Sequence, residues 1–320
     1  MAKTVALDMT RTGAEDHLHR RLSIMVLMGG PSAERSVSLA SGEAVAAALE
    51  SRGHRVRRAD VRPDDLSALE HAGVDVFFVA LHGPFGEDGQ LQEILEQRGL
   101  RYTGSGSRAS RLGIDKIEAR RRFAQAGIPT PPFAVAEAGR CDNIVLDFPL
   151  PVVVKPVDQG SSVGCSIVRQ ASDLDSAVAH VVETYGRCLM EPYICGPELT
   201  VGILAGEALP VCQIRSATAF YDYEAKYQDD RTEYLFDIDL PDELLQRVQQ
   251  LSVTAFETLG CRDMSRVDWM IDAATYQPYC LEVNTIPGFT SHSLLPKAAA
   301  RAGICFADLC ERIVRLATQR

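Results

Sequence analysis

Two stretches near the end of the chain alternate polar and apolar residues as β-strands do. The first places Arg266 and Asp268 on one face, and the second places Glu282 and Asn284 on one face, because successive strand side chains point to opposite sides. A turn-forming segment, residues 272–278, separates them. The pattern predicts a hairpin in which Asp268 lies opposite Glu282 and Arg266 lies opposite Asn284.

This hairpin gathers carboxylate and amide oxygens without a histidine or cysteine. Such a set suits a hard cation such as Mg²⁺, which takes a few protein oxygens and leaves positions for phosphate. The alternative is a polar strand face on which arginine pairs with aspartate. The hairpin alone leaves both interpretations open.

The first third of the chain alternates predicted strands and helices. We expect strands at 23–28, 55–61 and 74–81 and helices at 38–52 and 63–71. This order favours a parallel sheet with right-handed crossovers. Ligands bind beyond the carboxyl ends of such strands, so we expect the loops at 29–38 and 82–89 to face one cleft.

The remaining two thirds mix helices with strand pairs. We expect a helix at 115–126, a strand–loop–strand unit at 151–168, a helix at 173–185, strands within 188–204, an ordered loop or lid at 220–234, a helix at 241–259 and two helical segments within 293–320. The basic residues from Arg98 to Arg122 are expected mostly on exposed helix faces.

The loop of the strand–loop–strand unit reads GSSVG at 160–164. A turn rich in Gly and Ser presents several backbone N–H groups that can bind phosphate oxygens, and Lys155 adds a positive charge. A hairpin with a flexible tip is the alternative. Downstream, Glu191 and Glu198 flank a Gly-Pro turn; they are either exposed strand-end carboxylates or acceptors for an adenine or ribose.

The common nucleotide signatures are missing. Residues 104–109 fit the pattern GxGxxG/A, but the strand before them is short and no acid lies at the expected distance downstream, so we reject a dinucleotide site. No GxxxxGK[ST] segment occurs either.

The composition narrows the class of protein. Of 320 residues, 46% are hydrophobic and 24% charged, which suits a folded chain with two or three cores, and the net charge of -10 argues against general affinity for nucleic acid or anionic membranes. The early apolar run at 22–28 is too short to span a bilayer, no convincing signal peptide is seen, and residues 1–21 are expected to be a loose polar extension. Nine scattered cysteines without a CxxC pair fit reduced packing residues in a cytoplasmic protein.

Eight motifs follow one another from about Ile24 to the C-terminus. They are GGPSAERSVSLASG, HGPFGEDGQLQ, DK at 115–116, VVVKP with GSSVG, EPYICGPELTV, YDYEAKY, SRVD and LEVNTIPGFTSHSLLP. In this order they resemble the motifs of the D-alanine–D-alanine ligases, a family of ATP-grasp enzymes.

The resemblance implies an α/β fold with α+β elements, in which an N-terminal Rossmann-like parallel-sheet domain precedes a two-subdomain ATP-grasp fold. The implied divisions are the extension at 1–21, the Rossmann-like substrate domain at 22–112, a central subdomain with the phosphate lid at 113–190, and a C-terminal subdomain with the Mg²⁺ and second-substrate sites at 191–320.

The resemblance also implies roles for residues at matching positions. For ATP they are the phosphate lysines Lys116 and Lys155, the phosphate lid of Gly160, Ser161, Ser162, Val163 and Gly164, the adenine and ribose contacts Glu191, Ile194 and Glu198, and the adenine-slot walls Phe220 and Met270. For two Mg²⁺ ions, with Mn²⁺ as an alternative, the ligands are Asp268, Glu282 and Asn284. For D-alanine they are Glu34 on the first ammonium in a set with Ser161 and Tyr227, His82 nearby, and Ser293 and Leu294 on the second carboxylate.

The implied reaction is the ATP-dependent ligation of two D-alanines through an acyl phosphate, for peptidoglycan precursor synthesis. Phosphoryl transfer to the first carboxylate needs positioning and charge neutralisation, and Lys226 would help to hold the transferring group. The second amine then attacks, and Arg266 and the Gly288 N–H match the groups that stabilise the tetrahedral oxygen. No residue is assigned as the general base.

Some positions depart from the family pattern, since Ser265 stands where Gly or Ala is usual and Cys165 replaces a common Met. Every group that the reaction needs is nevertheless present, and Tyr227 favours the dipeptide over an ester product. The alternatives are an ATP-grasp ligase with another acceptor, such as D-serine, D-lactate or a secondary-metabolite amine, and a non-catalytic nucleotide-binding module. The expected small-molecule partners are D-alanine and ATP, and binding to nucleic acid or to a membrane is not expected. We expect a homodimer, as relatives commonly form.

Overall fold

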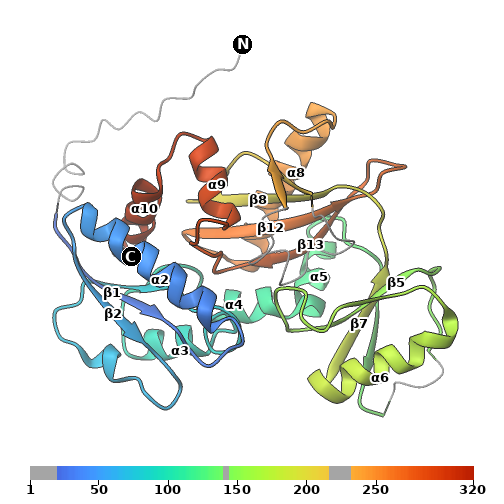
Figure 1. Cartoon of the computed structure of the whole chain (residues 1–320), viewed down its shortest axis with the longest axis horizontal. Helices are drawn as coiled ribbons and strands as arrows, with labels where there is room; N and C mark the ends of the chain where they lie inside the picture. The colour runs from blue at the N-terminus through green and yellow to red at the C-terminus, as the bar shows by residue number, and fades with distance from the viewer. Residues whose placement is uncertain (1–19, 140–143, 216–231) are drawn as a thin grey trace.

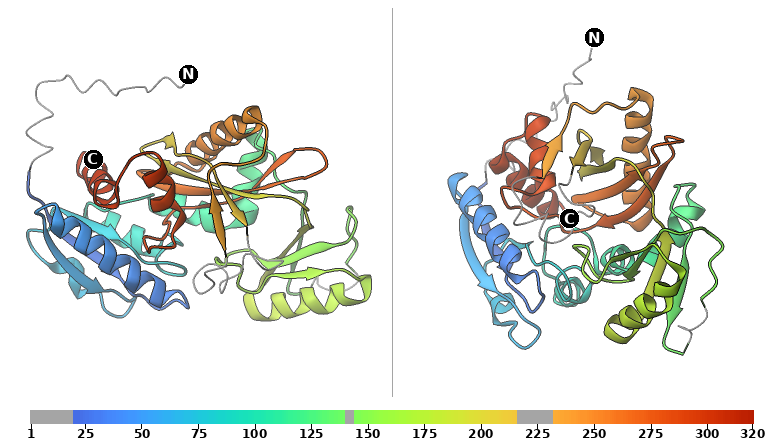
Figure 2. Two further views of the ribbon diagram at one scale, coloured as in Figure 1. Left: turned by 45° about the horizontal axis from the view of Figure 1, so that its top comes forward. Right: turned by 45° about the vertical axis from the view of Figure 1, so that its right-hand side comes forward.

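Three β-sheets follow one another along the chain, and helices cover each of them (Figures 1 and 2). The computed structural model describes residues 20–139, 144–215 and 232–320. The N-terminal sheet is parallel and the other two are antiparallel, so the predicted fold class is confirmed. The expected extension at 1–21 lies almost wholly outside the described residues.

The N-terminal sheet has the strand order β2-β1-β3. Its central strand, SIMVLM, is apolar and almost fully buried, as expected of a parallel strand covered on both faces. The three predicted strands, their parallel arrangement and the predicted helix after the first strand are confirmed here. The elements are β1 (Ser23–Met28), α2 (Arg35–Ser51), β2 (Arg55–Asp60), η1 (Ser67–Glu70), β3 (Val76–Val79), α3 (Gln90–Gln97) and α4 (Ser107–Ile114).

The helix expected at 63–71 is wrong, because only the short 3₁₀ helix η1 forms there. The Asp65 carboxylate accepts hydrogen bonds from the Ser67 backbone N–H at 3.1 Å and from the Ser67 hydroxyl at 2.7 Å. Local side-chain bonds of this kind compete with the backbone bonds of a helix. The segment therefore folds as a turn.

The central sheet has the strand order β4-β7-β5-β6, and its β5 and β6 form the predicted hairpin with Val152 opposite Val168. Helix α6 covers one face with Leu174 and Val178, which pack against the buried valines of β5. The elements are α5 (Lys116–Gln125), β4 (Ala134–Glu137), β5 (Val152–Pro156), β6 (Ser166–Val168), η2 (Ala171–Asp173), α6 (Leu174–Tyr185) and β7 (Arg187–Pro192).

The C-terminal sheet has the order β11-β10-β8-β12-β13, with β9 beside β8. Strands β12 and β13 pair in the predicted register, with Asp268 opposite Glu282 and Arg266 opposite Asn284. The opposite face of β12 is buried against α8. The elements are β8 (Glu198–Leu204), β9 (Glu207–Ala208), β10 (Cys212–Arg215), β11 (Glu233–Leu235), α8 (Asp242–Leu259), β12 (Met264–Ile271), β13 (Pro278–Asn284), α9 (Leu294–Arg301) and α10 (Phe306–Thr318).

The last two helices return to the N-terminal sheet, where α10 lies beside α2 (Figure 1). One hydrophobic core joins Val45 and Phe78 of the N-terminal part with Leu295 and Ile313 of these helices. Phe289, from the loop after β13, contacts Phe78 edge-on with ring centroids 5.3 Å apart. The N-terminal sheet and the C-terminal sheet are therefore packed into one body.

The expectations about membrane-spanning segments and about the cysteines can be compared with the fold. Within the part of the chain that the structure describes, no helix is both long and apolar enough to cross a membrane. The eight cysteines in that part are all free, and five of them are buried as packing residues, at 188, 212, 261, 280 and 310.

Candidate active site

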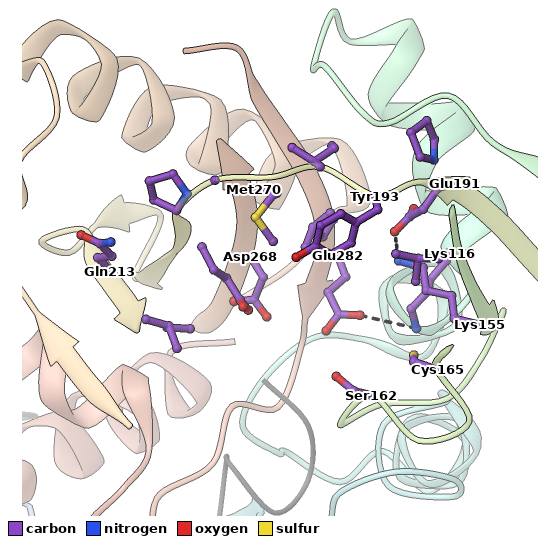
Figure 3. Close-up of a pocket in the computed structure, with 18 of the residues that line it drawn as sticks. Lys116, Lys155, Ser162, Cys165, Glu191, Tyr193, Gln213, Asp268, Met270 and Glu282 are labelled. Atoms are coloured by element: carbon purple, nitrogen blue, oxygen red, sulfur yellow. Dashed lines mark hydrogen bonds and ion pairs between the residues drawn. The ribbon is translucent and has the colours of Figure 1, made fainter. Parts of the chain in front are cut away.

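A cavity of about 520 Å³ lies between the central sheet and the C-terminal sheet (Figure 3). This volume is typical of a small-molecule site. Polar groups from both sheets line it, with apolar walls between them. The predicted site residues on its surface are Lys116, Lys155, Ser162, Glu191, Ile194, Glu198, Asp268, Met270 and Glu282.

Two buried lysines enter the cavity from the central part. The Asp115 carboxylate caps α5 by accepting hydrogen bonds from the backbone N–H groups of Ile117 and Glu118, each at 3.0 Å, and this fixes Lys116 at the first helical position. Lys116 Nζ donates to the Gln159 carbonyl at 2.7 Å and lies 3.4 Å from Glu282 Oε2. Lys155 Nζ, from β5, lies 2.5 Å from Glu191 Oε1.

Glu191 also forms an ion pair with Arg120, whose side chain is fully buried. Burial opposes the ionised carboxylate, but Arg120 and Lys155 together hold the pKa of Glu191 below its usual range. The expectation of exposed faces for the basic residues of 98–122 is therefore wrong for Arg120. Its guanidinium lies 5.6 Å from the centre of the Phe133 ring, and it comes from the α5 face that packs inward.

The loop at 160–164 adopts left-handed backbone angles at two non-glycine residues, since φ is 51° at Ser161 and 56° at Ser162. These residues form a turn, and the backbone N–H groups of a turn can point to one concave side and bind an anion. Gly164 also has a positive φ, and a Cβ there would lie 2.7 Å from the Tyr185 ring. Val163 and Gly164 belong to the loop, but they line neither this cavity nor the smaller one beside it.

The polar face of the β12–β13 hairpin has the expected oxygen groups, and it also contains the alternative arginine–aspartate pair. Arg266 Nη2 donates to Asp268 Oδ2 at 2.6 Å, and the Thr200 hydroxyl donates to Asp268 Oδ1 at 2.7 Å. Asn284 Oδ1 accepts a hydrogen bond from the Ile286 N–H at 3.0 Å. The donor set of two carboxylates and one amide oxygen fits Mg²⁺ chemically.

A second, smaller cavity adjoins the first, and Glu282 lines both. On its wall the Ser161 hydroxyl donates to Glu34 Oε1 at 2.5 Å, which links the loop at 160–164 to the N-terminal part. The other predicted residues that it brings together are His82, Gly160, Arg266, Asn284, Gly288, Ser293 and Leu294.

Gly288 and Ser293 are close neighbours in this second cavity. A Cβ at Gly288 would lie 2.6 Å from Ser293 Oγ, so a larger residue would displace the serine. Ser293 Oγ accepts a hydrogen bond from the Thr290 N–H at 2.9 Å, and this closes the turn that leads into α9. The turn places both residues on one wall.

The structure adds residues that the sequence patterns did not single out. Glu87 lines the second cavity, and its Oε1 lies 3.4 Å from His82 Nδ1. Gln213 lines the first cavity from β10. The position of Glu87 in the polar loop five residues after His82 was a usable signal, whereas nothing near Gln213 in the sequence marks it. The predicted residues Phe220, Lys226 and Tyr227 lie outside the described residues, as does most of the loop at 220–234.

The chain is similar to known proteins over most of its length. Residues 123–315 match the family model described as D-ala D-ala ligase C-terminus, and residues 59–105 match D-ala D-ala ligase N-terminus. The D-alanine–D-alanine ligase of Desulforudis audaxviator is 46% identical over 304 residues, which cover 93% of this chain and 99% of that protein. The corresponding ligase of Syntrophotalea carbinolica is 45% identical over 299 residues, covering 93% and 96%.

A solved structure shows the same similarity in three dimensions. The D-alanine–D-alanine ligase of Bacillus anthracis complexed with ATP superposes with a TM-score of 0.80 at 32% sequence identity, covering 93% of this chain and 98% of that one.

Proposed function

Because this chain belongs to the D-alanine–D-alanine ligase family, we propose that its large cavity binds ATP and that the adjoining cavity receives the two D-alanines. The enzyme joins two D-alanine molecules in an ADP-forming reaction. One observation carries the assignment of the cavities: Glu282 lies where they meet, which is where the γ-phosphate must approach the first carboxylate.

At the ATP end we propose that Lys116 and Lys155 neutralise phosphate charge beside the loop at 160–164. Both ammonium groups are buried at the cavity wall, where Lys116 pairs with Glu282 and Lys155 pairs with Glu191. Glu191, Ile194 and Met270 would contact the adenine, and Glu198 the ribose. Phe220 and Lys226 remain proposals from the resemblance.

We propose that Asp268, Glu282 and Asn284 hold Mg²⁺ through their oxygens. The ion would neutralise the charge of the phosphates and align them. Arg266 Nη2 lies 2.6 Å from Asp268 Oδ2, so this carboxylate is held in place on the wall of the large cavity.

At the substrate end, Glu34 would receive the first ammonium group, with Ser161 and Tyr227 beside it. The first carboxylate takes the γ-phosphoryl group from ATP, and the resulting acyl phosphate is attacked by the amine of the second D-alanine. Arg266 and the Gly288 N–H would stabilise the negative oxygen of the tetrahedral intermediate, which then expels phosphate. Ser293 and the Leu294 N–H would hold the second carboxylate.

We further propose that the chain works as a homodimer in the cytoplasm, with functional units at 22–112, 113–190 and 191–320. The free cysteines of the described residues support a reducing compartment. Gel filtration with light scattering tests the dimer.

The reaction is tested with purified protein, ATP and Mg²⁺. Phosphate release is expected with D-alanine and not with L-alanine, together with a product of the mass of D-alanyl-D-alanine. Equal release with both enantiomers, or none with either, would refute the proposal. The same assay with D-serine and D-lactate as acceptors tests the alternative products.

A further inference from the structure

Ser41 connects two parts of the second cavity that are far apart in the sequence. It lies on α2, is fully buried, and accepts a hydrogen bond from the backbone N–H of Phe289 at 3.1 Å. The same hydroxyl oxygen lies 3.3 Å from His82 Nε2. One side chain of the N-terminal part thus contacts both the His82 loop and the backbone that follows Gly288.

His82 is held from both sides. Its Nδ1 lies 3.4 Å from Glu87 Oε1, and Glu87 Oε2 accepts a hydrogen bond from the Gly83 N–H at 3.1 Å. Burial lowers the pKa of His82, but the carboxylates of Glu87 and Glu34 outweigh it and raise that pKa overall. A hydroxyl both donates and accepts, so Ser41 can partner His82 Nε2 in either protonation state.

The loop around Gly288 has apolar anchors on both sides. Ile286 packs in one core of the N-terminal part and Phe289 in the other. Between them the Gly288 backbone lies close to Ser293. The hydrogen bond to Ser41 holds the peptide between Gly288 and Phe289, and this restrains the Gly288 Cα, to which the N–H of the preceding peptide is attached.

We infer that Ser41 is a positioning residue for the second step of the reaction: it holds the backbone at Gly288 so that the Gly288 N–H points at the tetrahedral oxygen. This inference rests on the proposed function, in which Gly288 stabilises that oxygen. Ser41 does not itself line the second cavity. It acts through the Phe289 N–H on one side and through His82 on the other.

The test uses the full-length enzyme with the substitution Ser41→Ala. We expect kcat to fall about tenfold, as for a slightly misplaced oxyanion donor, while the KM values for ATP and the first D-alanine change less than about twofold. A dipeptide phosphinate, whose tetrahedral phosphorus copies the intermediate, should inhibit the variant more weakly by a similar factor. Ser41→Cys keeps the volume and a weak acceptor, so it should retain more activity than Ser41→Ala.

Ser38→Ala is the matched control. Ser38 lies one turn earlier on α2 and is equally buried, and its hydroxyl donates to the Ala80 carbonyl at 2.7 Å and accepts from the Gly29 N–H at 2.8 Å. This variant loses buried hydrogen bonds without touching the Gly288 loop, so it should lose stability but keep the inhibition by the phosphinate.

The outcomes separate the two proposals. A wild-type protein that forms no D-alanyl-D-alanine would refute the proposed function itself. An active wild type whose Ser41→Ala variant keeps its kcat and its phosphinate inhibition would overturn the role of Ser41. Equal losses of kcat in the Ser41→Ala and Ser38→Ala variants would also overturn it, because lower stability of the fold would then explain both losses.

Discussion

Glu191, which lines the large cavity, forms an ion pair with Arg120, and both side chains are buried although they are 71 positions apart in the chain. Glu191 also forms an ion pair with Lys155, so two cations share one carboxylate. The carboxylate proposed to contact adenine and the lysine proposed to contact phosphate are therefore held in place by an arginine that does not itself line the large cavity.

The substitution Arg120→Met removes one cation from this group and should lower the free energy of unfolding by about 3 kcal/mol, because a buried carboxylate loses a partner. We also expect a higher KM for ATP, since Glu191 and Lys155 become free to shift. Denaturant unfolding and steady-state kinetics measure the two effects.

Arg121→Met is the control for that substitution. Arg121 is the next residue on α5, and its side chain is exposed and pairs with Glu118 at the surface. Surface pairs of this kind contribute at most about 1 kcal/mol. Equal stability of the two variants would show that the buried pair contributes no more than the exposed one.

The substitution Glu282→Gln should weaken the dependence of the reaction on Mg²⁺. Glutamine keeps the shape but removes the charge that we propose for the metal and that now faces Lys116 at 3.4 Å. The Mg²⁺ concentration for half-maximal ADP release should rise at least about tenfold. Removing a residue that only hydrogen-bonds to a metal ligand already lowers metal affinity by about that factor. An unchanged Mg²⁺ titration would exclude Glu282 as a ligand. Glu257→Gln, on the exposed face of α8, serves as the control.

Ser265 and Ser252 make a matched pair for stability. Both are fully buried, but Ser265 Oγ has no hydrogen-bond partner among the described residues, whereas Ser252 Oγ accepts from Trp269 Nε1 at 2.8 Å. Ser265→Ala should leave stability unchanged or increase it by up to about 1 kcal/mol, and Ser252→Ala should lower it by about 1–3 kcal/mol. Thermal unfolding of both variants measures these changes in stability. If Ser265→Ala lowers stability as much as Ser252→Ala, Ser265 Oγ must have a hydrogen-bond partner, and the prediction is wrong.

His54 should make stability depend on pH. Its Nδ1 accepts from the Leu22 N–H at 3.1 Å, and its Nε2 faces Glu311 at 3.5 Å. Burial lowers the pKa of His54, Arg315 and Arg21 lower it further, and Glu311 opposes them only in part. The unfolded chain therefore binds a proton more readily than the folded one, so this contribution to stability is present above the unfolded pKa of about 6.5 and is lost as the pH falls toward the folded pKa.

The substitution His54→Gln isolates this effect, because the glutamine carbonyl can still accept from Leu22 while its side chain does not titrate. The difference in unfolding free energy between wild type and variant should shrink as the pH falls from 7.5 to 5.5, the window set by that titration. His82 titrates in both proteins and cancels in the difference. If the difference in unfolding free energy stays constant across these pH values, the pH dependence does not come from His54.

The sequence patterns predicted the hairpin well because strand alternation and a turn are local properties. The register that places Asp268 opposite Glu282 follows from where polar and apolar residues alternate. The burial of Arg120 could not be predicted in this way. Three arginines follow one another at 120–122, and which one turns inward depends on Glu191, a partner from another strand. The contact between Ser41 and Phe289 spans 248 positions and leaves no periodic signal.

The central sheet differs from the other two in how it is attached. Among the described residues, its strands share no hydrophobic cluster with the N-terminal or C-terminal sheet, and helix α5 contributes Ile117 to a central cluster but Phe123 to the C-terminal one. Helix α5 and the Ser161–Glu34 hydrogen bond are therefore two connections between the central sheet and the rest of the molecule. A movement of the central sheet away from the N-terminal part would have to break this hydrogen bond, which joins the loop at 160–164, part of the wall of the large cavity, to a wall of the second one.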